Sequence, residues 1–181
     1  PGYYTVELAD PGVKAELTAS PHAALHRYTF HNADSASVLI DRQHGPAWNE
    51  NQYHSQVQSC ETNWEDAQTL PGHVRNSVWV NQDYFFVMKF NRPVIDTQYL
   101  PMAETEKGKR IIATFDMKPG EELLMKVAMS TTGVDGAKKN MEAEIADWNF
   151  EGVKQAAHNE WNNNLSRIEV TGTDDEKTNF Y

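Results

Sequence analysis

One short segment of this sequence combines side chains that could recognise a sugar. In Gly72-His73-Val74-Arg75-Asn76-Ser77-Val78-Trp79, a glycine typical of a turn precedes a histidine, a forked donor and a large aromatic ring. A guanidinium donates several hydrogen bonds, and an indole presents an apolar face beside a polar edge. We therefore predict that Arg75 and Trp79 bind substrate; the same residues also suit a strand packed under a neighbouring layer.

The acidic residues, histidines and cysteine show no other recognisable catalytic or metal-binding pattern. Glu65 and Asp66 are adjacent, so on a strand they would face opposite sides and could not form the separated pair of a glycosidase. His22, His26 and His31 are the closest group of histidines, but no helical His-x-x-x-His pair and no accompanying carboxylate completes a set of metal ligands. We expect structural or solvated histidines, a buried and inert Cys60, and no metal ion bound by this segment.

Length and charge exclude several classes of protein. The chain has 181 residues, with 16 Lys and Arg against 26 Asp and Glu, and a net charge of -10. Its longest basic run is Lys107-Gly108-Lys109-Arg110, too short for a nucleic-acid-binding face. No apolar run approaches the roughly 18 residues of a membrane span. We expect one folded domain with an appendage, no nucleic acid as a partner and no membrane span.

Residues 1–131 have the pattern of an antiparallel β-sandwich. Residues 3–8 and 13–18 read as two strands of a hairpin, because Asp10-Pro11-Gly12 between them is a strong turn signal. Further strands are predicted at residues 25–30, 37–41, 84–90, 110–115 and 122–129. Several short strands separated by turn residues are typical of a sandwich.

The pattern changes to helices after Thr131. Asp135 is a candidate N-cap for a helix that continues to Ile145, and apolar residues recur at three to four residue spacing over 150–168. Residues 168–170 read as a short strand. Thr173 and Glu176 form the pattern of a capping box, which predicts that another helix begins there.

Several stretches, in order along the chain, resemble bacterial α-mannosidases of glycoside hydrolase family 92. The opening Pro1-Gly2-Tyr3-Tyr4-Thr5-Val6-Glu7-Leu8 and the later His26-Arg27-Tyr28-Thr29-Phe30 are similar to runs in those enzymes. The resemblance continues through Tyr84 to Pro93, Leu124 to Ser130, Asn140 to Ile145, Leu165 to Val170, and Phe180-Tyr181. Around Ser77-Val78-Trp79 the chain departs from the family, which has a Ser-Gly-Trp-like pattern there.

The resemblance implies an architecture for the whole chain. Residues 1–131 would be an antiparallel β-sandwich of the super-sandwich, mutarotase-like type, without its N-terminal part. Residues 132–172 would be linker helices, and residues 173–181 would start an (α/α)6 barrel whose remainder is absent. Because the family's acid, base and calcium lie in that barrel, the resemblance places no catalytic residue and no calcium in this chain. It also implies that both ends are cuts in a longer polypeptide.

The resemblance implies a function as well. Family members are calcium-dependent, inverting exo-α-mannosidases that remove terminal α-linked mannose from N-glycans or mannan. This chain would be a non-catalytic portion, inactive alone, that packs on the catalytic barrel and rims the active site. Its partners would be the rest of its own polypeptide and mannose-containing glycans, at a periplasmic, cell-surface or secreted location.

Two alternatives from other functional classes stay open at this point. A stand-alone carbohydrate-binding module would need an exposed aromatic platform, for which Trp48, Trp64 and Trp79 are candidates. A purely structural interaction domain would need no such platform.

Overall fold

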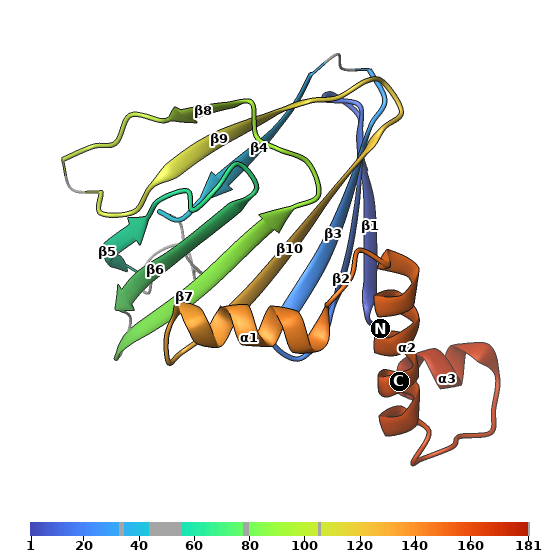
Figure 1. Ribbon diagram of the computed structural model, residues 1–181. Coiled ribbons are helices and arrows are strands. Elements are labelled where there is room, and N and C mark those ends of the chain that lie inside the picture. Colours follow the sequence, from blue (N-terminus) through green and yellow to red (C-terminus); the bar gives the residue numbers. More distant parts are fainter. Residues whose placement is uncertain (33–34, 44–55, 78–79, 105, 181) are drawn as a thin grey trace.

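The computed structural model describes residues 1–32, 35–43, 56–77, 80–104 and 106–180, which form ten strands and three helices (Figure 1). The strands are β1 (Tyr3–Leu8), β2 (Val13–Ala19), β3 (Ala23–Phe30), β4 (Ser35–Asp41), β5 (Gln56–Thr62), β6 (Thr69–Ser77), β7 (Asn81–Phe90), β8 (Asp96–Tyr99), β9 (Arg110–Asp116) and β10 (Glu122–Ser130). The helices are α1 (Val134–Glu144), α2 (Phe150–Leu165) and α3 (Asp174–Phe180).

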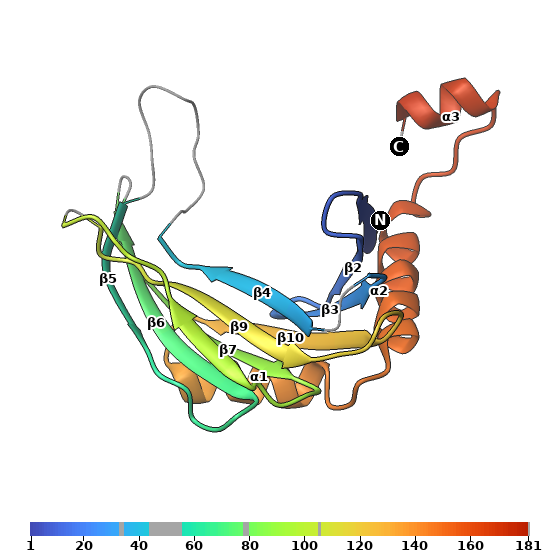
Figure 2. The same cartoon turned by 90° about the horizontal axis from the view of Figure 1, so that it is seen from above.

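The strands form two antiparallel sheets that face each other. Seven strands pair in the order β1-β2-β3-β10-β7-β6-β5, and three pair in the order β4-β9-β8. Figure 2 shows that the larger sheet is curved, with β4 and β9 on its concave side and α1 on its convex side. The predicted antiparallel β-sandwich followed by helices is therefore confirmed, including the hairpin of β1 and β2.

Alternation along the strands explains how the larger sheet covers two cores. On β10, Leu123 and Met125 pack in the core between the sheets, whereas Ala128 packs in the core beneath the helices. Across the sandwich, the rings of Phe90 and Phe115 lie 4.9 Å apart, and both residues are fully buried. Successive side chains of a strand point to opposite faces of the sheet, so apolar residues can be buried on both faces only when both faces are covered, as they are here.

The first helix attaches to the convex face through polar contacts at its C-terminal end. Glu144 Oε2 accepts hydrogen bonds from Ser20 Oγ at 2.5 Å and from the His22 backbone amide at 2.8 Å. After the helix, Lys126 Nζ donates to the Ala146 carbonyl at 3.0 Å and lies 4.3 Å from the centroid of the Trp148 ring. Burial lowers the pKa of this lysine. These contacts hold the connection between α1 and α2 on the sheet.

The helix ends differ in part from the predictions. The N-cap of α1 is Gly133, whose φ of 153° suits glycine, so Asp135 lies in the first turn instead of at the cap. Residues 168–170 follow α2 as irregular chain and not as a strand, because no partner strand lies beside them in the described residues. The capping box is confirmed: the Glu176 amide donates to Thr173 Oγ1 at 3.3 Å, and the Thr173 amide donates to Glu176 Oε2 at 2.8 Å.

Candidate functional site

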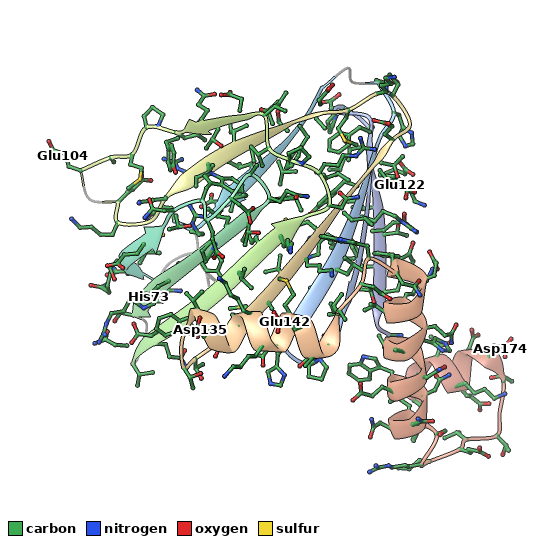
Figure 3. The ribbon with its side chains drawn as sticks, in the orientation of Figure 1. His73, Glu104, Glu122, Asp135, Glu142 and Asp174 are labelled. Carbon is green, nitrogen blue, oxygen red and sulfur yellow. The ribbon has the colours of Figure 1, made fainter. Side chains whose placement is uncertain are left out.

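The register of β6 and β7 places Arg75 in a polar cluster on the convex face of the sheet. Arg75 pairs with Asp83, and His73 pairs with Phe85, so all four side chains share one face. Figure 3 shows His73 at the same end of the sheet as Asp135 in the first turn of α1. The sequence singled out Arg75, but it did not identify Asp83, because strand register cannot be read from one strand.

Asp83 uses both carboxylate oxygens to hold its two neighbours. His73 Nε2 lies 2.7 Å from Asp83 Oδ1, and Arg75 Nη1 lies 3.2 Å from Asp83 Oδ2. The His73 ring stacks on Phe85 with centroids 4.5 Å apart and 17° between the planes. The Arg75 side chain is 45% exposed. It therefore has donors at the surface, where the fork could meet hydroxyl groups, while Asp83 restricts its position.

Gly72 lies inside β6 and not in a turn, which corrects its sequence interpretation. A Cβ atom there would lie 2.4 Å from Cζ of Phe86, so the glycine gives the Phe86 ring room to lie against β6. This ring belongs to a small buried cluster with Val57, Cys60 and Val74. Cys60 is buried, as predicted.

The aromatic residues proposed as a platform do not all lie in the described part of the chain. Trp48 and Trp79 fall outside it, so substrate binding by Trp79 stays a prediction. Trp64 is half-buried and packs on the core, with its ring centroid 6.2 Å from that of Phe90. This packed position does not suit Trp64 for an exposed sugar-stacking surface.

The acidic pair beside Trp64 has structural partners. Glu65 Oε2 lies 2.5 Å from Lys138 Nζ on α1. Asp66 accepts hydrogen bonds from the Gln68 amide at 2.7 Å and from Thr69 Oγ1 at 3.1 Å, and the Gln68 bond is the main cause of a lowered pKa at Asp66. A lowered pKa at Asp66 is the opposite of what a general acid would require.

The three early histidines also lie apart, each beside a different partner. His22 Nδ1 lies 2.6 Å from Glu144 Oε1, and His26 Nδ1 lies 2.8 Å from the Tyr28 hydroxyl. His31 Nε2 lies 3.5 Å from Glu7 Oε2. Within the described residues, no three His, Cys, Asp or Glu side chains come together as metal ligands.

Comparison with known proteins gives the family. Residues 1–130 match a model of the glycosyl hydrolase family 92 N-terminal domain, and residues 136–181 match a model of the family's catalytic domain. The chain belongs to glycosyl hydrolase family 92. The resemblance seen in the sequence is therefore confirmed for the N-terminal β-sandwich of family 92 and for part of its catalytic domain.

Solved structures of family 92 proteins share this fold. The chain is similar to the α-mannosidase BT3965 of Bacteroides thetaiotaomicron, with TM-score 0.82, 24% identity, and coverage of 96% of this chain and 24% of that chain. It is also similar to the inverting mannosidase BT2199 of the same organism, with TM-score 0.76, 22% identity, and coverage of 97% of this chain and 24% of that chain. A third similar structure is the family 92 glycosyl hydrolase ccman5, with TM-score 0.73, 20% identity, and coverage of 96% of this chain and 25% of that chain. The chain thus spans about a quarter of these relatives.

A search of curated proteins gave no match. Among the described residues, none of the helices combines the length and the hydropathy that crossing a membrane would require.

Proposed function

We propose that this family 92 chain is a non-catalytic portion of an exo-acting α-mannosidase that removes terminal α-linked mannose from N-glycans or mannan. The observation that supports it best is the succession of an N-terminal-domain match and a catalytic-domain match within one chain. Two of the similar structures are named as mannosidases, and one of them has also been solved with mannoimidazole bound. These are properties of the relatives and support the same substrate class here.

In this proposal the chain positions substrate and leaves bond cleavage to the remainder of the enzyme. An inverting hydrolase needs two carboxyl groups about 6.5–9.5 Å apart with a water molecule between them. Glu65, Asp66 and Asp83 are all engaged with neighbouring groups on the sandwich. The sandwich would pack on the catalytic barrel, and Arg75 would donate hydrogen bonds to sugar hydroxyls at the rim of the active site.

The proposed enzyme depends on calcium, whose ligands would lie elsewhere in the polypeptide. The described residues do not fit a calcium site, because no group of three acidic or histidine side chains comes together. No chemical step is therefore assigned to a metal on these residues.

The proposed substrates also suggest where the protein works. N-glycans and mannan lie outside the cytoplasm, so we propose a periplasmic, cell-surface or secreted location. Cell fractionation followed by immunoblotting of the full-length protein tests this, and recovery with cytoplasmic markers alone would contradict it.

The decisive experiment assays the full-length protein encoded by the complete reading frame. We expect release of mannose from an α-mannoside, loss of that release in EDTA with recovery on adding calcium, and β-mannose as the first product by NMR. The 181-residue chain assayed in parallel should release none. A full-length protein without mannosidase activity would refute the substrate class, and activity of the 181-residue chain would refute its non-catalytic role.

A further inference from the structure

An exposed carboxylate lies beside Arg75 on the same face of the larger sheet. Strand β5 is the edge strand next to β6, at the end of the sheet away from α2 (Figure 1). Its register pairs Glu61 with His73, two residues along β6 from Arg75. Paired residues share a face, and diagonal neighbours lie about 7–8 Å apart, so Glu61 and Arg75 are within reach of one small ligand. Cys60, the residue before Glu61, is buried on the opposite face.

Glu61 and Arg75 carry opposite charges, yet they do not pair with each other. Arg75 directs Nη1 at Asp83 Oδ2, 3.2 Å away on the other neighbouring strand, β7. Within the described residues, no hydrogen bond or ion pair engages the exposed Glu61 carboxylate. The edge of the guanidinium formed by Nε and Nη2 also has no partner there. An open acceptor on β5 therefore lies next to an open pair of donors on β6.

The donors have a fixed support, whereas the acceptor is free to adjust. His73 Nε2 lies 2.7 Å from Asp83 Oδ1, and the His73 ring stacks on Phe85. Packing thus restricts the imidazole, the imidazole restricts one oxygen of Asp83, and the other oxygen of Asp83 orients the guanidinium. Glu61 lies on an edge strand without such support, so its side chain can follow a ligand held by Arg75.

The charges around this pair determine which class of ligand fits. The carboxylates of Glu61 and Asp83 flank Arg75 on both sides and would repel an anion. A metal ion is also unsuited, because no three possible ligands come together among the described residues. A neutral ligand with neighbouring hydroxyl groups uses both charges: the guanidinium donates to one hydroxyl oxygen, and the carboxylate accepts from the next hydroxyl. Sugars have this chemistry.

We propose that Arg75 and Glu61 together bind two neighbouring hydroxyl groups of one sugar residue in the glycan substrate, with Asp83 and His73 as positioning residues. The inference rests on the proposed function, because it takes the substrate class from it and extends the Arg75 site to β5. Arg75 donates from its Nε–Nη2 edge, and Glu61 accepts. Since the site lies at the rim, the bound sugar is one that follows the terminal mannose in the chain.

Isothermal titration calorimetry of the full-length protein with an S-linked α-mannotriose tests the site. The sulfur linkage resists hydrolysis, so binding is measured without turnover. Glu61→Ala and Arg75→Ala should each raise the Kd about tenfold or more, the effect of losing a hydrogen bond to a charged group. Glu61→Gln keeps an acceptor oxygen without the charge and should lose less affinity.

A matched control comes from the other edge of the same sheet. Glu7 is an exposed glutamate on the edge strand β1, so Glu7→Ala removes the same charge from the protein at a distance from the site. Its Kd should equal that of the wild type. If Glu61→Ala bound the mannotriose as tightly as Glu7→Ala, the proposal would be wrong.

A double-mutant cycle tests the positioning role of Asp83. Asp83→Asn removes the charge that orients the guanidinium and should raise the Kd in the wild-type background. In the Arg75→Ala background the same change should add nothing, because the group that it positions is absent. A further loss of affinity there would show that Asp83 does not act through Arg75 and would overturn this part of the proposal. His73→Phe, which keeps an aromatic ring on Phe85, should behave like Asp83→Asn.

Comparison with turnover of an O-linked α-mannotriose separates this inference from the proposed function. Binding that is weakened in Glu61→Ala, by a protein that cleaves no mannoside, would support the site and refute the proposed reaction. Cleavage by a protein whose binding is unaffected in Glu61→Ala would refute the site alone. A wild-type protein that binds no mannotriose would refute both.

Discussion

Arg27 on β3 holds the buried carboxylate of Glu16 on β2 by two hydrogen bonds. Nε lies 2.8 Å from Oε2, and Nη2 lies 2.9 Å from Oε1. The same guanidinium lies 4.2 Å above the Phe150 ring, and its Nη2 also reaches Glu151 at 3.0 Å. One side chain thus connects two strands of the sandwich to the start of α2.

Removing this guanidinium should destabilise the protein strongly. Arg27→Met leaves Glu16 buried without its main partner, which costs about 3–5 kcal/mol. The control is Arg92→Met, because Arg92 and Glu121 form a solvent-exposed pair at 3.3 Å, and water screening should make its contribution to stability small. Urea unfolding of the full-length protein measures both. If the two variants lost equal amounts of unfolding free energy, burial of the Arg27–Glu16 pair would not be what makes it important for stability.

The stability contributed by Glu16 should disappear in acid. Chiefly through its hydrogen bond with Arg27, the pKa of Glu16 falls from 4.5 to about 2. A carboxyl with a depressed pKa stabilises the fold above its unfolded value, and this is lost as pH falls from 4.5 to 2. Thermal unfolding as a function of pH should show a shallower acid decline in Glu16→Gln than in the wild type. Parallel curves would show that Glu16 does not contribute.

On acidification, the loss of stability caused by His26 should begin at a higher pH than the loss caused by Glu16. Burial lowers the pKa of His26 from 6.5 to about 4, so the folded protein keeps the ring neutral where the unfolded chain protonates it. Stability is then lost as pH falls from 6.5 to 4, by about 2–4 kcal/mol in full. NMR titration of the imidazole measures this pKa directly, and a value near 6.5 would contradict the prediction.

Replacing Arg42 should stabilise the protein, whereas replacing Arg27 should destabilise it. Arg42 is 7% exposed, and among the described residues its side chain makes one long hydrogen bond, 3.4 Å to the Lys109 carbonyl. Its Nε and Nη1 are buried without a hydrogen-bond partner among the described residues. Arg42→Met should therefore raise the free energy of unfolding by about 1–4 kcal/mol.

A second arginine provides the control for Arg42. Arg110 has a carboxylate partner, Glu106, at 3.0 Å, and donates to the Pro101 carbonyl at 2.9 Å. Arg110→Met should lower stability in the same calorimetric scan. A loss of stability in both variants would show that Arg42 has a partner that these contacts do not include.

Arg75→Ala should weaken mannoside turnover by the full-length enzyme with little effect on folding. The loss of one charge-assisted hydrogen bond to a sugar costs ~1.5–3 kcal/mol, which corresponds to a turnover rate about ten- to a hundred-fold lower. Arg92→Ala is the matched control, since Arg92 also forms a partly exposed ion pair with a carboxylate. Unchanged kinetics, or a fall explained by a lower melting temperature, would leave Arg75 with a purely structural role.

Local pattern in the sequence predicted the elements whose determinants are close together in the chain. The β1–β2 hairpin follows from alternation around Asp10-Pro11-Gly12, and the start of α3 follows from Thr173 and Glu176. The strands β5 and β8 were not predicted, and part of β6 was predicted only as an alternative to a sugar-binding segment, because their residues mix polar and apolar side chains without regular alternation. Polar residues tolerated on a curved sheet obscure the period-two signal.

By itself the sequence determined the β-sandwich with its helices, the acidic charge, the family and the choice of Arg75 as a candidate. Only the tertiary structure decided that Arg75 meets Asp83, that Glu16 meets Arg27, and that Tyr4 and Trp161 line one groove. Periodicity shows which side chains share a face of an element, but not which element lies opposite. Pairing such as that of β10 with β3 and β7 depends on packing between segments far apart in the chain.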